Sequence, residues 1–259
     1  VSDPVDAGML PDVVRGDIEI EAVSFGYQPG VLVVEDVDLH ITPGERVAIV
    51  GETGAGKSTL ARLVLRFYDP VDGKVLIDGV DLSTVTAADR ATHIVLIPQE
   101  GFLFNGTLRD NLRYARPDAD DDELWNVCRE VGIEKWVRDL PERLDTLVRE
   151  RGSRFSAGER QLVALARALL ADPAVIVLDE ATSNLDPETE VRVERALSTV
   201  LEGRTAVVIA HRLRTAEGAD WVVMMDRGRI TATGPHLDLA RKDPGYARLV
   251  SVWERGILR

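Results

Sequence analysis

The sequence predicts an α/β fold with a mostly parallel sheet built around a phosphate-binding loop. The stretch Gly51–Thr59, GETGAGKST, lies between a short apolar run, RVAIV, and a helical run from Leu60 to Phe67. Strand, glycine-rich loop and helix in this order form the context that such a loop requires. In the second half, the apolar runs AVIVL, TAVVIA and WVVMM are separated by helical segments. Nearly uninterrupted apolar runs are typical of parallel strands that are buried on both faces.

The N-terminal third is rich in strand signals. Residues 1–16 contain Pro4, Gly8 and Pro11 without periodicity, and we expect a linker there. From Asp17 onward, short apolar or alternating runs are bounded by Gly and Pro. They predict strands at Ile18–Phe25, Val37–Ile41, Arg46–Val50, Lys74–Asp78 and His93–Ile97.

Helical periodicity appears in the middle of the chain. Asp121–Leu140 repeats apolar residues on one helical face, with Cys128 as a small core residue. A second helix is expected from Ala157 to Leu170. The helix after Asp186 has Pro187 at its first position and Gly203 at its end, which are good boundary signals.

Composition describes a chain with enough apolar material for a core. Its 259 residues suit one large α/β domain or two small ones, with 45% hydrophobic and 29% charged residues. The formal charge of −13 argues against a general nucleic-acid surface, because phosphate backbones favour Lys and Arg. A single cysteine leaves no internal disulfide and fits a reducing compartment. No apolar run reaches the ~18 residues that cross a bilayer. Because the chain starts without methionine, we expect a piece of something longer.

The glycine-rich loop fits the template G-x-x-x-x-G-K-[ST] at every fixed position. Small residues let backbone N–H groups surround a polyphosphate, and the following helix N-terminus adds positive potential. Lys57 is placed to reach the outer phosphates, and Ser58 offers its hydroxyl to Mg²⁺. A chance glycine-rich turn is the alternative, which the correct flanks disfavour. The predicted nucleotide-binding set is Gly51, Glu52, Thr53, Gly54, Ala55, Gly56, Lys57, Ser58 and Thr59.

A second acidic element supplies groups for chemistry. The apolar run AVIVL ends in Asp179 and Glu180. Asp179 at a strand end can hold Mg²⁺, directly or through water, beside Ser58. Glu180, one residue further, can polarise an attacking water as general base. A solvated acidic turn is the alternative, which becomes less attractive beside a phosphate-binding loop.

The order of these motifs resembles the nucleotide-binding domain of ATP-binding cassette (ABC) transporters. The phosphate loop, Gln99 after a strand, FSAGE opening a helix, strand-Asp-Glu, SNLD and strand-His follow one another as in that family, from Asp17 onward. The segments FLFNGTLRDNL and RERGSRFS look most like the exporter-type class. The resemblance implies a RecA-like core, an N-terminal antiparallel β subdomain and an inserted helical subdomain at about 100–165. It also implies a domain at 17–259 and a linker from a membrane domain at 1–16.

Single residues gain roles from this resemblance. Tyr27 matches the aromatic residue that stacks on adenine; the alternative interpretation is a core tyrosine at a strand end. Gln99 matches the glutamine that reaches Mg²⁺ and water and senses the membrane domains. His211 matches the histidine that orients the terminal phosphate and the attacking water; a structural histidine after a buried strand is the alternative. The resemblance thus implies Glu180, His211, Lys57 and Gln99 as catalytic residues, and Ser58, Gln99 and Asp179 at Mg²⁺. His40, His93 and His236 have no comparable setting.

The signature stretch departs from the family pattern. FSAGE stands where LSGGQ is usual. Ser156 and Gly158 still match residues that contact ATP held by the opposite subunit, and Ala157 is tolerable. Glu159 either complements its own helix dipole, which is the favoured interpretation, or repels the partner's phosphates. In the second case this chain would pair with a different subunit, as a heterodimer rather than a homodimer, and build one stronger and one weaker ATP site. Asp186 matches the residue that links the two sites across the dimer, and it also reads as a helix cap.

The resemblance implies an ATPase that powers transport. Two such domains would close head to tail on ATP and Mg²⁺ and open after hydrolysis. Transmembrane domains at the cytoplasmic face of the membrane would use this movement, most simply to export a small molecule or lipid. An ATP-binding switch with little turnover and an importer on the same scaffold are alternatives. A soluble cassette ATPase of DNA repair is disfavoured because heptad runs and cysteine clusters are absent from the sequence.

Overall fold

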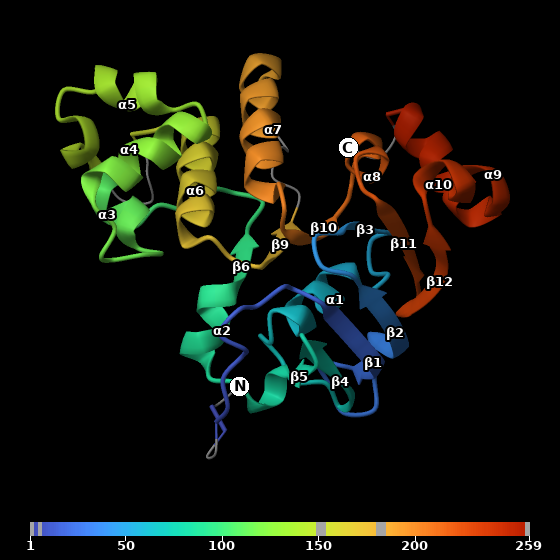
Figure 1. Cartoon of the computed structure of the whole chain (residues 1–259). Coiled ribbons are helices and arrows are strands. Elements are labelled where there is room, and N and C mark those ends of the chain that lie inside the picture. Colours follow the sequence, from blue (N-terminus) through green and yellow to red (C-terminus); the bar gives the residue numbers. More distant parts are fainter. Residues whose placement is uncertain (1–2, 5–6, 149–153, 180–184, 257–259) are drawn as a thin grey trace. The chain divides into compact units, whose positions relative to one another are not determined.

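The computed structural model describes residues 3–4, 7–148, 154–179 and 185–256, and these form two compact units (Figure 1). Unit 1 comprises Val1–Leu96, Ala174–Asp179 and Gly203–Arg259, and unit 2 comprises Ile97–Pro173 and Glu180–Glu202. In the described residues, no helix combines the length and the apolar character of a membrane-spanning segment.

Unit 1 is built on a six-stranded sheet in the order β12-β11-β3-β10-β9-β6. The pairs β11–β3, β3–β10 and β10–β9 are parallel, and β12 runs antiparallel to β11. The mostly parallel sheet predicted from the sequence is therefore confirmed. The strands are β3 (Arg46–Val50), β6 (Ile94–Ile97), β9 (Val175–Asp179), β10 (Thr205–Ile209), β11 (Trp221–Asp226) and β12 (Arg229–Gly234).

Both faces of this sheet are covered. In β3, Val47 and Ile49 pack into a core with α1 (Lys57–Val64), whereas Ala48 and Val50 pack into a second core on the other face. The second core includes residues of the C-terminal helices α8 (Leu213–Glu217), α9 (His236–Lys242) and α10 (Pro244–Glu254). Successive side chains of a strand point to opposite faces, so a strand covered twice must be apolar throughout.

A second, antiparallel sheet carries the order β2-β1-β4-β5. Its strands share the core that includes α1. They are β1 (Ile18–Phe25), β2 (Val34–Ile41), β4 (Asp72–Ile77) and β5 (Val80–Asp81). The expected antiparallel β subdomain is present. The predicted bounds of β2, β4 and β6 were off by one to three residues. The helix after the phosphate loop, α1, starts at Lys57 and ends at Val64, short of Phe67.

The N-terminal segment lies against unit 1. The N–H of Gly8 donates to the carbonyl of Thr84 at 2.7 Å, next to the 3₁₀ turn η1 (Leu82–Thr84). Leu10 is buried, and its N–H donates at 2.7 Å to the carboxylate of Asp89 in α2 (Ala87–His93). Polar and apolar contacts therefore fix this segment, although its sequence is typical of a linker.

Unit 2 is mainly helical, and its described residues include a two-stranded antiparallel sheet of β7 and β8. The sequence predicted a single helix over Asp121–Leu140, which is wrong because Gly132, with φ 75°, ends one helix before another begins. Cys128 is buried, as expected. The elements are β7 (Gly106–Thr107), α3 (Leu108–Arg113), α4 (Asp121–Glu130), α5 (Glu134–Asp139), η2 (Arg143–Asp145), β8 (Leu147–Val148), α6 (Ala157–Ala171) and α7 (Pro187–Leu201).

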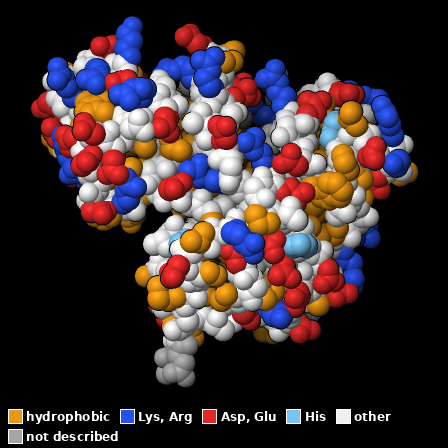
Figure 2. Space-filling model, viewed as in Figure 1, with side chains coloured by type: hydrophobic (Ala, Val, Ile, Leu, Met, Phe, Trp, Pro, Cys, Tyr) orange, Lys and Arg blue, Asp and Glu red, His pale blue; other side chains and the backbone are white. Residues whose placement is uncertain are grey.

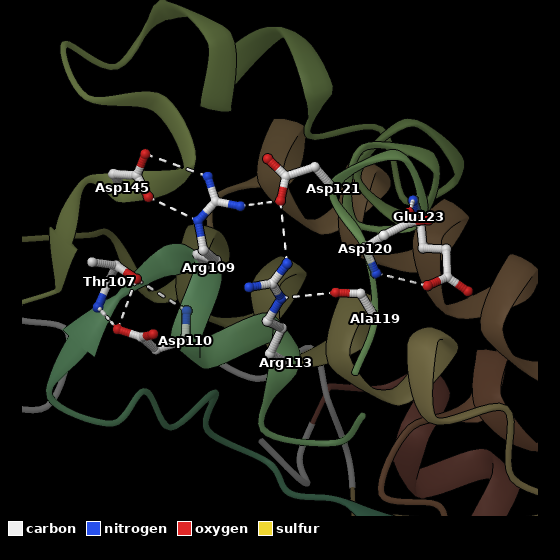
Figure 3. Close-up of polar contacts among 9 residues, drawn as sticks. All are labelled: Thr107, Arg109, Asp110, Arg113, Ala119, Asp120, Asp121, Glu123 and Asp145. Atoms are coloured by element: carbon white, nitrogen blue, oxygen red, sulfur yellow. Dashed lines mark hydrogen bonds and ion pairs between the residues drawn. The ribbon is translucent and has the colours of Figure 1, made fainter. Parts of the chain in front are cut away.

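Ion pairs join the short helices of unit 2 (Figure 3). Arg109 on α3 binds Asp145 of η2 at 2.8 Å and also Asp121 at the start of α4. Arg113, one turn along α3, binds Asp121 and the carbonyl of Ala119. On the face seen in Figure 2, acidic and basic side chains are interspersed over this unit rather than gathered in one stripe. The negative charge of Asp121, the first residue of α4, is thus neutralised by arginines of its own unit.

Candidate functional site

The phosphate loop follows β3 and leads into α1, as its sequence predicts. Gly51 has φ 145°, and a Cβ there would lie 2.2 Å from the carbonyl oxygen of Met225. Gly56 has φ 102°, and a Cβ would lie 2.9 Å from the carbonyl oxygen of Val33. Both positions therefore require glycine for backbone conformation and for space. A chance glycine-rich turn would not explain these two constraints together with the flanking strand and helix.

Lys57 lies at the centre of the loop. Its ammonium donates to the carbonyls of Gly51 at 2.8 Å and Glu52 at 3.0 Å, and the residue is only 5% exposed. Burial lowers the pKa of Lys57, and the carboxylate of Asp179 partly offsets this effect. The N-cap of α1 is Gly56, which provides no side-chain hydrogen bond. The first N–H groups of α1 are therefore left to serve an anion.

The ends of three parallel strands bring Asp179 and His211 to the same edge of the sheet as this loop. Asp179 pairs in register with Ile209, and Ile209 pairs with Ile49. Gly51 and His211 each follow these paired residues by two positions. The carboxyl ends of parallel strands share one edge of the sheet, which is where ligands bind in open α/β sheets. Lys57, Asp179 and His211 are thus collected at one edge of unit 1.

Tyr27 lies just beyond the end of β1 and is not a core residue. Its side chain is 46% exposed, so the interpretation as a buried tyrosine is wrong. Its hydroxyl shares a hydrogen bond of 3.1 Å with the hydroxyl of Thr59 and accepts another from Arg62 at 3.0 Å. Thr59 and Arg62 belong to α1, so the ring is tied to the helix that begins in the phosphate loop.

Gln99 belongs to unit 2 and follows β6 by two residues. The backbone around it is fixed to α6. Gln161 on α6 donates to the carbonyl of Pro98 at 3.3 Å. A Cβ on Gly101 would lie within 2.5 Å of the backbone of Arg160 and Gln161. Gln99 therefore stands on a segment that packs directly on α6.

The start of α6 carries Ser156, Ala157, Gly158 and Glu159. Ser156 is the N-cap and accepts from the N–H of Glu159 at 3.2 Å, while the Glu159 carboxylate accepts from the N–H of Ser156 at 2.7 Å. This reciprocal pair is a capping box, and it turns the carboxylate back onto its own helix. Gly158 is buried, and a Cβ there would lie 2.0 Å from Cγ2 of Thr189 on α7.

Asp186 caps α7, as one of its two interpretations predicts. Its carboxylate accepts from the N–H of Thr189 at 3.1 Å, and hydrogen bonds from Thr189 lower the pKa of Asp186. Its role across a dimer stays a prediction. Glu180, the predicted general base, lies outside the described residues.

Two histidines other than His211 have structural settings. His40 contacts Asp17, and His236 hydrogen-bonds the buried Tyr246.

A metal ion at this edge would depend on few protein ligands. The described residues contain no group of three or more His, Cys, Asp or Glu side chains that could hold a metal. Mg²⁺ prefers oxygen ligands and usually keeps several waters, being held by one or two protein groups together with substrate phosphates. The hydroxyl of Ser58 and the carboxylate of Asp179 supply that chemistry in unit 1. The donor set fits Mg²⁺ that arrives with a nucleotide.

Sequence reasoning missed three contacts near the candidate site residues: Arg62 with Tyr27, Gln161 with Pro98, and the close approach of Gly101 to α6. Arg62 lies three positions after Thr59, a spacing that places both on one side of a helix, but nothing nearby signals Tyr27 as its partner. Gly101 and Gln161 carried no signal beyond their positions near Gln99 and Ser156. All three contacts join residues far apart in the sequence.

Comparison with known proteins gives one consistent family. The family profile described as ABC transporter matches residues 34–183. An uncharacterized ABC transporter ATP-binding protein of Bacillus subtilis is 45% identical over 237 residues, covering 92% of this chain and 39% of that protein. A fatty acid ABC transporter ATP-binding/permease protein of Mycobacterium bovis is 40% identical, covering 93% of this chain and 38% of that protein.

A solved structure is similar over the whole chain. The structure of a bacterial Atm1-family ABC exporter with ATP bound has a TM-score of 0.89 and 39% identity, and it covers 100% of this chain and 45% of that chain. The chain thus spans about two fifths of the length of the curated relatives described above.

Proposed function

This chain belongs to the ABC transporter family as an ATP-binding domain, and from that membership we propose that it powers transport by closing on ATP with a second such domain. ATP lies between the phosphate loop of one subunit and the α6 tip of the other. Closure is favoured only with the terminal phosphate present, so hydrolysis lets the two domains separate. Attached transmembrane domains convert opening and closing into movement of cargo.

The observation that supports this proposal most is the convergence at the sheet edge. The phosphate loop, the uncapped start of α1, Asp179 and His211 meet at the carboxyl ends of β3, β9 and β10. Lys57 binds the outer phosphates, and its charge is stabilised there because phosphates replace the loop carbonyls as partners. His211 orients the terminal phosphate and the attacking water. Glu180 takes the proton from that water as general base.

Mg²⁺ belongs to the same proposal. Ser58 and Asp179 hold it at the sheet edge, and the resemblance assigns Gln99 to the same ion. When bound, the ion neutralises the phosphate oxygens as negative charge develops. Ser156, Ala157, Gly158 and Glu159 form the α6 tip at the nucleotide of the opposite subunit, with the Glu159 carboxylate kept in its own capping box. Asp186 communicates between the two sites.

Export from the cytoplasmic side of the membrane is the direction we propose. Two of the similar proteins support it: one is an ABC exporter, and another is a fatty acid ABC transporter ATP-binding/permease protein. Residues 1–16 then connect to the permease part. A small molecule or lipid is the proposed cargo class.

The test is the variant Glu180→Gln, with Glu188→Gln as the matched control. Glu188 is an exposed glutamate in the first turn of α7. We expect Glu180→Gln to bind ATP, to lose nearly all phosphate release and to accumulate as an ATP-dependent dimer in light scattering. Glu188→Gln should behave as the unaltered chain. Normal steady-state turnover in Glu180→Gln would remove Glu180 as the base, and absence of ATP binding by the unaltered chain would refute the proposed function.

A further inference from the structure

The hydroxyl of Tyr27 is held by the helix that follows the phosphate loop. Arg62 donates to the Tyr27 oxygen at 3.0 Å, and the hydroxyl of Thr59 lies 3.1 Å from the same oxygen. Both residues come from α1, which begins at Lys57. The position of the phenol ring is therefore coupled to the position of the phosphate loop.

The ring of Tyr27 is also restrained by two neighbouring aromatic rings. Phe25 and Tyr68 stand nearly perpendicular to it, at centroid distances of 5.1 Å and 5.3 Å. Such perpendicular arrangements are the ones that aromatic pairs prefer. Even with these neighbours, nearly half of the Tyr27 side chain is exposed. The ring is thus fixed by its hydroxyl and its neighbours while part of it stays open to solvent.

Arg62 supplies a donor that stays charged. The hydrogen bond from its guanidinium to Tyr27 raises the pKa of Arg62 beyond its usual value. A charged donor makes a stronger hydrogen bond than a neutral one. Thr59 is buried, whereas Arg62 is exposed on the surface of α1. Arg62 can consequently be replaced with little effect on the core.

We propose that Arg62 is a positioning residue for nucleotide binding: it orients the ring of Tyr27 for stacking on a nucleotide base. This inference rests on the proposed function, because it needs a base at Tyr27. Arg62 acts through the Tyr27 hydroxyl and makes no contact with the nucleotide itself. Orienting the ring before the base arrives reduces the entropy that binding must offset.

The test is a double-mutant cycle with Arg62→Met and Tyr27→Phe in the 259-residue chain. Methionine keeps a long apolar stem, and phenylalanine keeps the ring without the hydroxyl. We expect each single variant to weaken ATP binding by about two- to tenfold in calorimetry, the range of one modest hydrogen bond. The double variant should bind as weakly as Tyr27→Phe alone, because Arg62 acts only through the hydroxyl that this variant lacks. KM for ATP should rise with kcat unchanged.

Two controls separate the possible outcomes. Arg241→Met removes another exposed arginine, from α9 of the same unit, and should leave ATP binding unchanged. Inorganic tripolyphosphate has no base, so its affinity should be the same in the Arg62→Met variant and the unaltered chain. Arg62→Lys keeps a charged donor and should restore part of the ATP affinity.

The inference fails if Arg62→Met weakens ATP binding by the same factor in the Tyr27→Phe background, because Arg62 would then contact the nucleotide directly. It also fails if Arg62→Met weakens tripolyphosphate and ATP equally. Unchanged ATP affinity in Arg62→Met overturns the inference alone, since the proposed function survives. A chain that binds neither ATP nor tripolyphosphate overturns both.

Discussion

The contact between Gly158 and Thr189 predicts a specific loss of stability when a methyl group is added. A Cβ at Gly158 would lie 2.0 Å from Cγ2 of Thr189 and 3.4 Å from its Cβ. Turning the methyl away by rotation about χ1 would also move the Thr189 hydroxyl, which hydrogen-bonds Asp186, so the methyl is held in place. Overpacking of this kind costs about 1–3 kcal/mol. Better helix propensity of alanine returns at most about 1 kcal/mol. From the middle of the overpacking range, about 2 kcal/mol, this leaves a net destabilisation of about 1–2 kcal/mol for Gly158→Ala.

A double-mutant cycle isolates the contact. Thr189→Ser removes the methyl but keeps the hydroxyl, which hydrogen-bonds Asp186. In that background Gly158→Ala should be neutral or slightly stabilising, which gives a coupling energy of about 1–3 kcal/mol. Thr189→Val is the matched control, because it keeps the methyl and Gly158→Ala should still destabilise. The assay is thermal unfolding followed by circular dichroism, with an expected drop of about 2–8 °C for Gly158→Ala alone.

Two results would refute this reasoning. Equal loss of stability in the Thr189→Ser background would show that another contact excludes a side chain at Gly158. No loss in the unaltered background would show that α6 and α7 can move apart freely. If Gly158→Ala with Thr189→Ser regains stability but not ATP turnover, glycine is also needed for nucleotide contact, as the resemblance implies.

Three further predictions concern single groups. Burial lowers the pKa of Lys57, and bound phosphates favour its charged form. ATP affinity should therefore fall as pH rises through the pKa that Lys57 has in the nucleotide-free chain, and ATP binding there should take up a proton. Calorimetry in buffers of different ionisation enthalpy should detect this proton. A pH-independent affinity would contradict this. Burial raises the pKa of Cys128 to about 12; its thiol should react with maleimide at neutral pH only after unfolding, and rapid labelling of the native chain would be the contrary result. The Glu159 carboxylate is used in its own capping box; Glu159→Gln should leave single-turnover hydrolysis unchanged, whereas faster hydrolysis would mean that this carboxylate weakens an ATP site.

Local sequence signals predicted the parts of the fold that depend on short segments. The phosphate loop was predictable because its strand, glycines, lysine and helix are contiguous, and each glycine meets a constraint of its own backbone. The apolar runs indicated strands covered on both faces, which β3 confirms with alternate residues in two cores. The break at Gly132 was missed because apolar periodicity continued on both sides of it.

Contacts between distant segments could not be predicted in this way. Tyr27 and Arg62 are 35 positions apart, and Leu10 and Asp89 are 79 apart. Their meeting depends on how strands and helices pack, which no single segment encodes. The N-terminal residues illustrate this point, because their sequence predicts a linker while hydrogen bonds attach part of them to unit 1.

The start of α6 shows why a motif does not identify its role by itself. Ser156 and Glu159 cap their own helix, and Gly158 makes room for Thr189. Beyond them, the backbone of Gln161 lies against Gly101. Ser156, Gly158 and Glu159, which the resemblance assigns to a partner's ATP, therefore also have a reason within unit 2. Loss of ATPase activity after substitution here is ambiguous, because a loosened α6 and a lost phosphate contact give the same result. Only activity measured in variants of restored stability, such as Gly158→Ala with Thr189→Ser, can distinguish the two causes.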